Sequence, residues 1–224
     1  MNDETIDDVD LARFRPGPRR EPCQLYLISP QDVGGTFPDR LRAALDGGPV
    51  AAFQLRVKGV DDHALARLAE PLQAICAEHD VAFIVNDSMR LAKRLGADGV
   101  HLGQSDDDPR EARDLLGPTA QIGRTCHDSR HLAMEAGEAG CDYVAFGAFY
   151  PTTTKPSHYR PDPLILSWWS AITEIPSVAI GGITPVNAAP LVTAGADFIA
   201  VCQAVWGTTD PGAAVADFER ALAL

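Results

Sequence analysis

The sequence predicts a single-domain (β/α)8 barrel, a TIM barrel of the α/β class, over residues 23–224. Short β-rich apolar runs alternate with longer amphipathic stretches, which favours parallel strands joined by helices. A Gly-X-Asp repeat at residues 96, 140 and 195 closes a helical stretch and opens a strand each time, at steps of about two strand-helix units. An open doubly wound sheet ranks second, because no glycine-rich nucleotide-binding motif follows any strand.

Each element follows from local pattern. Leucine and isoleucine at three- and four-residue steps predict a helix over 61–79, and a second amphipathic stretch predicts one over 130–139. The glycine of each repeat suits the left-handed residue that ends a helix. Residues 1–22 lack apolar periodicity and are predicted to be a flexible tail. The expected strands are 25–29, 50–57, 81–85, 98–102, 120–123, 142–147, 177–182 and 197–201.

Composition narrows the classes of partner. The chain has 19 Lys and Arg against 31 Asp and Glu, a net charge of −12 that disfavours nucleic acid and anionic membranes. The N-terminus is acidic, unlike a signal peptide, and no apolar run is long enough to span a bilayer. We therefore expect a cytoplasmic protein with small-molecule partners, and a homo-oligomer is left open. Five cysteines without a C-x-x-C spacing are interpreted as reduced, mostly buried thiols.

Basic side chains gather at predicted strand ends, where a barrel of this kind carries its function. Gln54, Arg56 and Lys58 alternate along the second strand, so they point to one side. Lys155 follows the sixth strand in the run PTTTK and is one of only three lysines. Arg56, Lys58 and Lys155 together could hold a diphosphate. The alternative is that Arg56 and Lys58 are solvated ends of an edge strand.

Two carboxylates belong to the same predicted rim. Asp87 and Asp106 end adjacent strands, and two oxygen ligands beside bound phosphates suit Mg²⁺. The alternatives are that Asp87 caps the following helix and that Asp106 lies in a solvated acidic loop.

Two further strand ends carry candidate residues. In the glycine turn at Gly182, we expect Thr184 to be the N-cap of the next helix, and exposed amides there could bind phosphate. His127 follows the fifth strand and could act as an acid or base, whereas His101 is interpreted as a hydrogen-bonded structural residue.

From about Leu25 to Trp206 the sequence resembles the thiamine phosphate synthase family of (β/α)8 enzymes. Several motifs in the family's order carry the resemblance: FQLRVK (53–58), VND (85–87), GADGVHLGQSD (96–106), GRTCH (123–127), YPTTTK (150–155) and IGGITPVNA (180–188). The resemblance implies an Mg²⁺-dependent transferase that joins a hydroxymethylpyrimidine diphosphate to a thiazole phosphate and releases pyrophosphate.

The resemblance also implies roles for individual residues, with Arg56, Lys58, Lys155 and Thr125 in the catalytic group. Gln54, Arg56, Lys58, Asn86 and Lys155 would hold the pyrimidine diphosphate, Asp87 and Asp106 the metal, Thr125 the pyrimidine or its leaving group, and Thr152, Thr154, Gly182 and backbone amides near Cys202 and Gln203 the thiazole phosphate.

Three alternatives remain open at this point. Arg124 in GRTCH is more like the related thiazole tautomerase branch, which would act through His127. Cys202 and Gln203 replace the small residue usual after the eighth strand, which leaves room for a non-catalytic barrel that binds a thiamine precursor. Another phosphate-binding barrel, such as a phosphosugar isomerase, would carry similar glycines.

Overall fold

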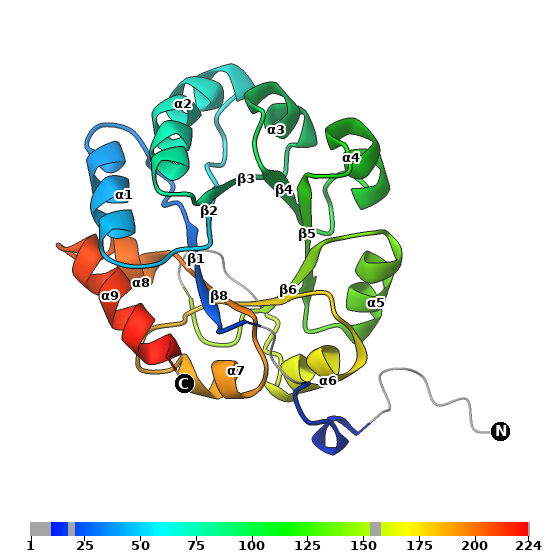
Figure 1. Ribbon diagram of the computed structural model, residues 1–224. Coiled ribbons are helices and arrows are strands. Elements are labelled where there is room, and N and C mark those ends of the chain that lie inside the picture. Colours follow the sequence, from blue (N-terminus) through cyan, green and yellow to red (C-terminus); the bar gives the residue numbers. More distant parts are fainter. Residues whose placement is uncertain (1–9, 18–20, 153–157, 224) are drawn as a thin grey trace.

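The computed structural model describes residues 10–17, 21–152 and 158–223, and its strands close into the predicted eight-stranded parallel barrel (Figure 1). Each strand pairs with the next along the chain, and the eighth pairs with the first. The strands are β1 (Gln24–Ile28), β2 (Ala52–Leu55), β3 (Ala82–Asn86), β4 (Gly99–Leu102), β5 (Gln121–His127), β6 (Tyr143–Gly147), β7 (Ser177–Ile180) and β8 (Phe198–Val201).

Helices form an outer ring around the barrel (Figure 1). No helix in the described ranges is both long enough and apolar enough to cross a bilayer. The helices are α1 (Phe37–Asp46), α2 (Asp62–Glu78), α3 (Met89–Leu95), α4 (Pro109–Leu116), α5 (Arg130–Glu138), α6 (Leu164–Ile172), α7 (Ala189–Thr193), α8 (Gln203–Trp206) and α9 (Pro211–Leu222), with a short 3-10 helix η2 (Leu11–Arg13) before the barrel.

Two apolar layers hold this arrangement. The larger layer lies between strands and helices, where one side of α2 buries Leu65, Leu72 and Ile75. The smaller layer fills the barrel interior. It is made by Tyr26, Ile28, Ala52, Ile84, Tyr143, Ala145, Val178 and Ala200.

The Gly-X-Asp repeat has a structural role at the amino end of the barrel. Its glycines have positive φ, as Gly96 shows with φ of 60°, and thus end helices as the sequence predicts. Each aspartate then accepts a hydrogen bond from the backbone of the neighbouring odd-numbered strand. The pairs are Asp98 with Phe83 N at 2.7 Å, Asp142 with Ile122 N at 2.6 Å and Asp197 with Ser177 N at 2.7 Å.

Part of the segment predicted as a tail lies against the barrel. Leu11 and Phe14 pack on the outer apolar layer, and η2 contacts α6. The Gly17 N–H donates to Ser170 Oγ at 3.1 Å.

Candidate active site

A cavity of about 420 Å³ opens at the carboxyl end of the strands, and all eight strands or their following loops contribute to its lining. Every described residue that the sequence assigned to catalysis, substrate or metal lines it: Gln54, Arg56, Lys58, Asn86, Asp87, Asp106, Thr125, His127, Thr152, Gly182, Cys202 and Gln203. Thr154 and Lys155 lie outside the described residues.

The loop after β1 positions the basic residues that follow β2. Strand β2 ends at Leu55, so Arg56 and Lys58 lie beyond it, although the sequence pattern predicts strand to residue 57. Ser29 Oγ accepts the Arg56 N–H at 2.8 Å, and the Gln31 side chain bonds both the N–H and the carbonyl of Lys58. These contacts explain how both cations face the cavity without strand pairing.

Asp87 reaches the cavity because the chain turns sharply at the end of β3. Its φ of 66° lies in the left-handed region, and its N–H donates to the His101 carbonyl at 2.8 Å. The alternative that Asp87 caps α3 is wrong, because Ser88 is the N-cap and its Oγ accepts the Leu91 N–H at 3.1 Å. The Asp87 carboxylate is thus available to the site.

In the acidic run after β4, the helix-capping aspartate and the aspartate that reaches the cavity are again different residues. Asp108 is the N-cap of α4 and accepts the Arg110 N–H at 2.7 Å. Asp106 Oδ2 instead accepts the Gly103 N–H at 2.6 Å, which folds the loop after β4 back toward the cavity.

The two carboxylates interact with each other and with Lys58. Lys58 Nζ donates to Asp87 Oδ2 in an ion pair. Burial pushes the pKa of Asp87 upward, but hydrogen bonds with Lys58 and Asp106 outweigh that effect and lower it. The pKa of Asp106 is raised by burial and then by the Asp87 carboxylate. Two crowded carboxylates are a favourable donor set for a divalent cation.

A metal ion bound by Asp87 and Asp106 would need a phosphorylated substrate to complete its coordination. Within the described ranges, no group of three or more His, Cys, Asp or Glu side chains is placed to hold a metal ion. Asp87 and Asp106 supply hard oxygen ligands, and Mg²⁺ is commonly bound by one or two carboxylates together with substrate phosphates and water. The residues present therefore fit Mg²⁺ bound together with a phosphorylated substrate.

Below the charged rim, five polar side chains form a hydrogen-bonded group that is called the cavity floor: Gln54, His101 and Thr125 line the cavity, and Tyr26 and Tyr143 lie in the barrel interior. Gln54 Nε2 donates to Tyr26 OH at 3.0 Å, and Tyr26 OH lies 3.1 Å from Tyr143 OH. His101 Nδ1 lies 3.1 Å from Tyr143 OH, and its Nε2 lies 2.8 Å from Thr125 Oγ1. His101 is thus hydrogen-bonded on both ring nitrogens. The sequence interpretation missed the two tyrosines as site residues, although each occupies a barrel-facing strand position.

Tyr143 fits across the floor because its neighbour on β5 has no side chain. A Cβ on Gly123 would collide with the Tyr143 ring. The ring also stacks on His101, with centroids 5.5 Å apart and an interplanar angle of 25°.

The opposite side of the cavity is backbone-rich. Gly182 has φ of 64°, and a Cβ there would collide with the Pro151 carbonyl, so the loop after β7 packs tightly on the loop after β6. Thr184 is not a helix N-cap, contrary to expectation, since α7 begins five residues later at Ala189. Asn187 fixes the intervening turn instead, through its bonds to Thr184 N at 2.8 Å and the Gly182 carbonyl at 3.1 Å.

His127 closes one side of the mouth. Pairing between β5 and β6 shifts register between Thr125 and His127, and His127 has φ of 55°. Its ring stacks on Tyr159 with centroids 4.1 Å apart, and Tyr159 lines the same cavity.

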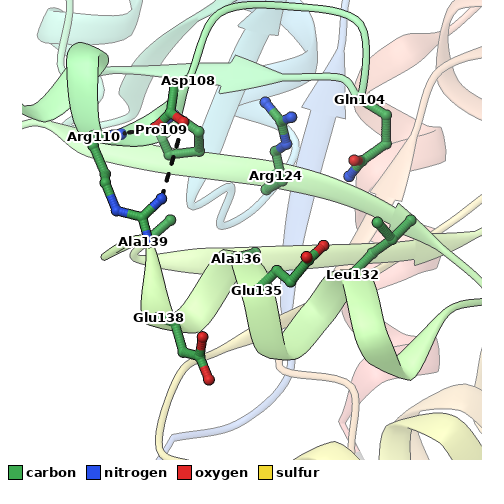
Figure 2. Close-up of a pocket in the computed structure, with 10 residues that line it drawn as sticks. All are labelled: Gln104, Asp108, Pro109, Arg110, Arg124, Leu132, Glu135, Ala136, Glu138 and Ala139. Carbon is green, nitrogen blue, oxygen red and sulfur yellow. Dashed lines mark hydrogen bonds and ion pairs between the residues drawn. The ribbon is translucent and has the colours of Figure 1, made fainter.

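Arg124 does not line this cavity. It projects to the other side of β5, into a separate outer pocket of about 280 Å³ between α4 and α5 (Figure 2). Its guanidinium donates to the Asp107 carbonyl at 2.9 Å. The residue that linked the sequence to the tautomerase branch therefore has a role outside the cavity.

Comparisons with known proteins agree with this geometry. A family model described as "Thiamine monophosphate synthase" matches residues 25–205. Thiamine-phosphate synthase from Erythrobacter litoralis is 65% identical over 90% of this chain and 96% of its own, and that from Rhodospirillum centenum is 55% identical over 89% and 98%. The solved thiamine phosphate pyrophosphorylase from Pyrococcus furiosus superposes with a TM-score of 0.77 at 30% identity, covering 89% of this chain and 95% of its own.

Proposed function

The chain belongs to the thiamine monophosphate synthase family, and we propose how its cavity carries out the reaction of that family. The enzyme is a transferase of thiamine biosynthesis. It condenses a hydroxymethylpyrimidine diphosphate with hydroxyethylthiazole phosphate, giving thiamine phosphate and pyrophosphate. A cytoplasmic location and a homo-oligomeric state stay sequence-based expectations.

One observation carries the mechanism: cations from β2 and carboxylates from β3 and β4 meet at one rim of one cavity. Arg56 and Lys58 line the cavity beside Asp87 and Asp106. The alternative that Arg56 and Lys58 are ends of an edge strand is wrong, because a closed barrel has no edge. We assign Arg56, Lys58 and Lys155 to the diphosphate, with Arg56 as a planar fork and the lysines as point charges.

These cations act on the leaving group. As the bond from the pyrimidine methylene to the diphosphate oxygen breaks, negative charge accumulates on the departing oxygens. Fixed positive charges stabilise that state more than the bound reactant, which lowers the barrier. The displacement is dissociative: the electron-rich pyrimidine methylene cation forms, and the thiazole nitrogen captures it.

Asp87 and Asp106 would hold Mg²⁺ against the diphosphate. When bound, the ion supplies charge neutralisation on phosphate oxygens. A bound cation would relieve the crowding that raises the pKa of Asp106, and Asp106 would bind the cation in its deprotonated form.

The remaining residues orient the two rings. Gln54, Asn86 and Thr125 would hold the pyrimidine, since they line the cavity floor and wall. Thr152, Thr154 and Gly182, with backbone amides near Cys202 and Gln203, would hold the thiazole phosphate on the opposite side. Holding two reactants in line contributes on the order of 7 kcal/mol or more.

The test is pyrophosphate release from the two substrates with and without Mg²⁺. We expect release that depends on Mg²⁺ and is abolished by Asp87→Ala and by Lys155→Ala. Lys93→Ala is the matched control, because Lys93 is an exposed lysine on α3 outside the cavity, and it should keep full activity. Unchanged release in both site variants would contradict the mechanism.

A second activity rests on one observation, the position of His127 in the cavity wall. A thiazole tautomerase would need His127 and the thiazole phosphate site, but it would not need Lys58 or the two carboxylates. Isomerisation of a thiazole phosphate without the pyrimidine substrate, lost in His127→Asn, would support that alternative. If no isomerisation is detected, the synthase reaction is the only activity that these observations support.

A further inference from the structure

We propose that the five polar side chains of the cavity floor form one directional hydrogen-bond chain, which presents Gln54 to the ligand as an acceptor and Thr125 as a donor. Tyr26, Tyr143 and His101 are then positioning residues that connect two ligand-binding residues across the barrel. The identity of the ligand as an aminopyrimidine rests on the proposed function, whereas the contacts of the chain rest on the structure and its direction is inferred from the Gln54 donor.

The chain joins five different strands. It begins at Gln54 on β2, passes to Tyr26 on β1 and to Tyr143 on β6, and returns through His101 on β4 to Thr125 on β5. The donor–acceptor distances are 3.0, 3.1, 3.1 and 2.8 Å in that order. Its three central members are 4%, 7% and 9% exposed, so water has little access to compete with these contacts.

The direction follows from counting hydrogens. Gln54 Nε2 donates to Tyr26, and the one hydrogen of the Tyr26 hydroxyl then has Tyr143 as its acceptor within the described chain. Tyr143 therefore passes its own hydrogen to His101 Nδ1. Burial raises the pKa of both phenols, which keeps both hydrogens in place at neutral pH.

His101 is fixed as the tautomer with its proton on Nε2, because Nδ1 accepts from Tyr143. Nε2 then donates to Thr125 Oγ1, and the Thr125 hydroxyl has its own hydrogen left for the cavity. At the other end, Gln54 is 3% exposed and lines the cavity, and its Oε1 has no partner among the described residues. An acceptor and a donor thus face the ligand from opposite walls.

This polarity selects a class of ring and one orientation of it. An aminopyrimidine carries an exocyclic N–H donor on one edge and ring-nitrogen acceptors on others, so it can satisfy both walls. An analogue with an oxo group in place of the amine would set an acceptor against Gln54 Oε1. A buried polar group left unpaired costs about 1–3 kcal/mol, which corresponds to roughly 5- to 150-fold in binding.

The first test reads the chain directly in the wild-type enzyme without ligands. ¹⁵N NMR of the histidine ring nitrogens, assigned with His101→Gln, should show His101 as the neutral Nε2–H tautomer at pH 7. The Nδ1–H tautomer or an imidazolium would overturn the proposed direction. The NMR measurement of the His101 tautomer does not depend on turnover, so it tests the proposed chain independently of the synthase activity.

The second test breaks the chain at one atom. Tyr143→Phe should raise KM for the pyrimidine diphosphate about 10- to 100-fold, leave KM for the thiazole phosphate unchanged, and reduce discrimination against the oxo analogue. Tyr26→Phe should act in the same direction. Ser177→Ala is the control, because it deletes a fully buried hydroxyl at the amino end of the barrel and should change neither KM. An equal loss for both substrates in Tyr143→Phe would show a merely structural role.

Discussion

The two ends of the barrel both carry aspartates, but in opposite circumstances. At the amino end, Asp98, Asp142 and Asp197 each accept a short hydrogen bond from a backbone N–H of a neighbouring strand. At the carboxyl end, Asp87 and Asp106 lie against each other beside Lys58. Backbone amides satisfy the first group, whereas in the second group the Asp87 carboxylate still raises the pKa of Asp106, a crowding that a bound cation would relieve.

This difference separates stability from function in one residue type. A carboxylate whose partners are backbone amides strengthens the fold, and removing it leaves a buried donor unsatisfied. A carboxylate whose pKa is raised by burial and a neighbouring carboxylate, as that of Asp106 is, disfavours the folded state in its charged form, and its value is realised only when a ligand binds. Substitutions at the two ends should therefore have opposite effects on stability and activity.

The largest expected effect is on activity at the carboxyl end. Asp87→Asn removes a charge from the proposed metal site, and we expect Mg²⁺-dependent pyrophosphate release to fall by about 100-fold or more. The melting temperature should fall only slightly, because Asp87 caps no helix and the ion pair with Lys58 that is lost is partly exposed. Normal pyrophosphate release by this variant would contradict a functional role for the aspartates at the carboxyl end.

At the amino end, the expected effect is on stability. Asp142→Ala leaves the Ile122 N–H without its acceptor and Arg113 without its ion pair, which has a distance of 2.6 Å. Both side chains are partly exposed, so we expect a loss of about 2 kcal/mol in the free energy of unfolding, measured in urea. Activity per folded molecule should be unchanged, and Asp142→Asn, which keeps an acceptor oxygen, should lose less.

The sequence predicts the amino end well because local chemistry determines it. A glycine with positive φ followed by an aspartate at a strand start is recognisable in one stretch of chain, and all three copies behave alike. The carboxyl rim was also predictable, since parallel strands bring their ends together and charged residues there are few. Cysteine usage was read correctly too, as four of the five thiols are buried and all are free.

Other features depend on contacts between distant segments and have no local signature. The hydrogen-bond chain at the cavity floor joins Tyr26 to Tyr143, which are far apart in sequence. No sequence feature near either tyrosine indicates that its hydroxyl is hydrogen-bonded to the other. Arg124 faces away from the cavity because side chains alternate along β5 and its neighbour Thr125 faces inward, and the motif by itself does not mark which of the two does so. The Thr184 expectation was wrong because the Asn187 side chain binds that turn and delays the helix.

A smaller effect tests the crowded pair itself. Burial and the Asp87 carboxylate raise the pKa of Asp106, so its charged form destabilises the folded state at neutral pH, and the penalty disappears as pH falls through the raised value. Asp106→Asn should therefore raise the melting temperature of the ligand-free enzyme at pH 7 by about 1–3 °C, while activity falls. A lower melting temperature would show that the pair is not repulsive.

The smallest effect concerns pH at the amino end. Asp46 accepts from the His79 ring at 2.9 Å and, with the Ile75 carbonyl, raises the pKa of His79. A raised folded-state pKa gives stability that is fully present below about pH 6.5 and is lost as pH rises through the folded value. Asp46→Asn should remove a difference of about 0.5 kcal/mol or less between pH 6 and pH 8 in urea unfolding. If the Asp46→Asn variant keeps the same difference in unfolding free energy between pH 6 and pH 8, that difference comes from other titratable groups.

The contact between Gly123 and Tyr143 also constrains how this enzyme can evolve. Neither position can change alone without cost: a larger residue at 123 collides with the ring, and a smaller residue at 143 opens a void beneath the substrate. Only paired exchange, with bulk moved from one strand to its neighbour, keeps the volume constant. Substitutions at positions 123 and 143 are therefore epistatic. Changing both residues together can reshape the base of the pocket while leaving its charged rim intact.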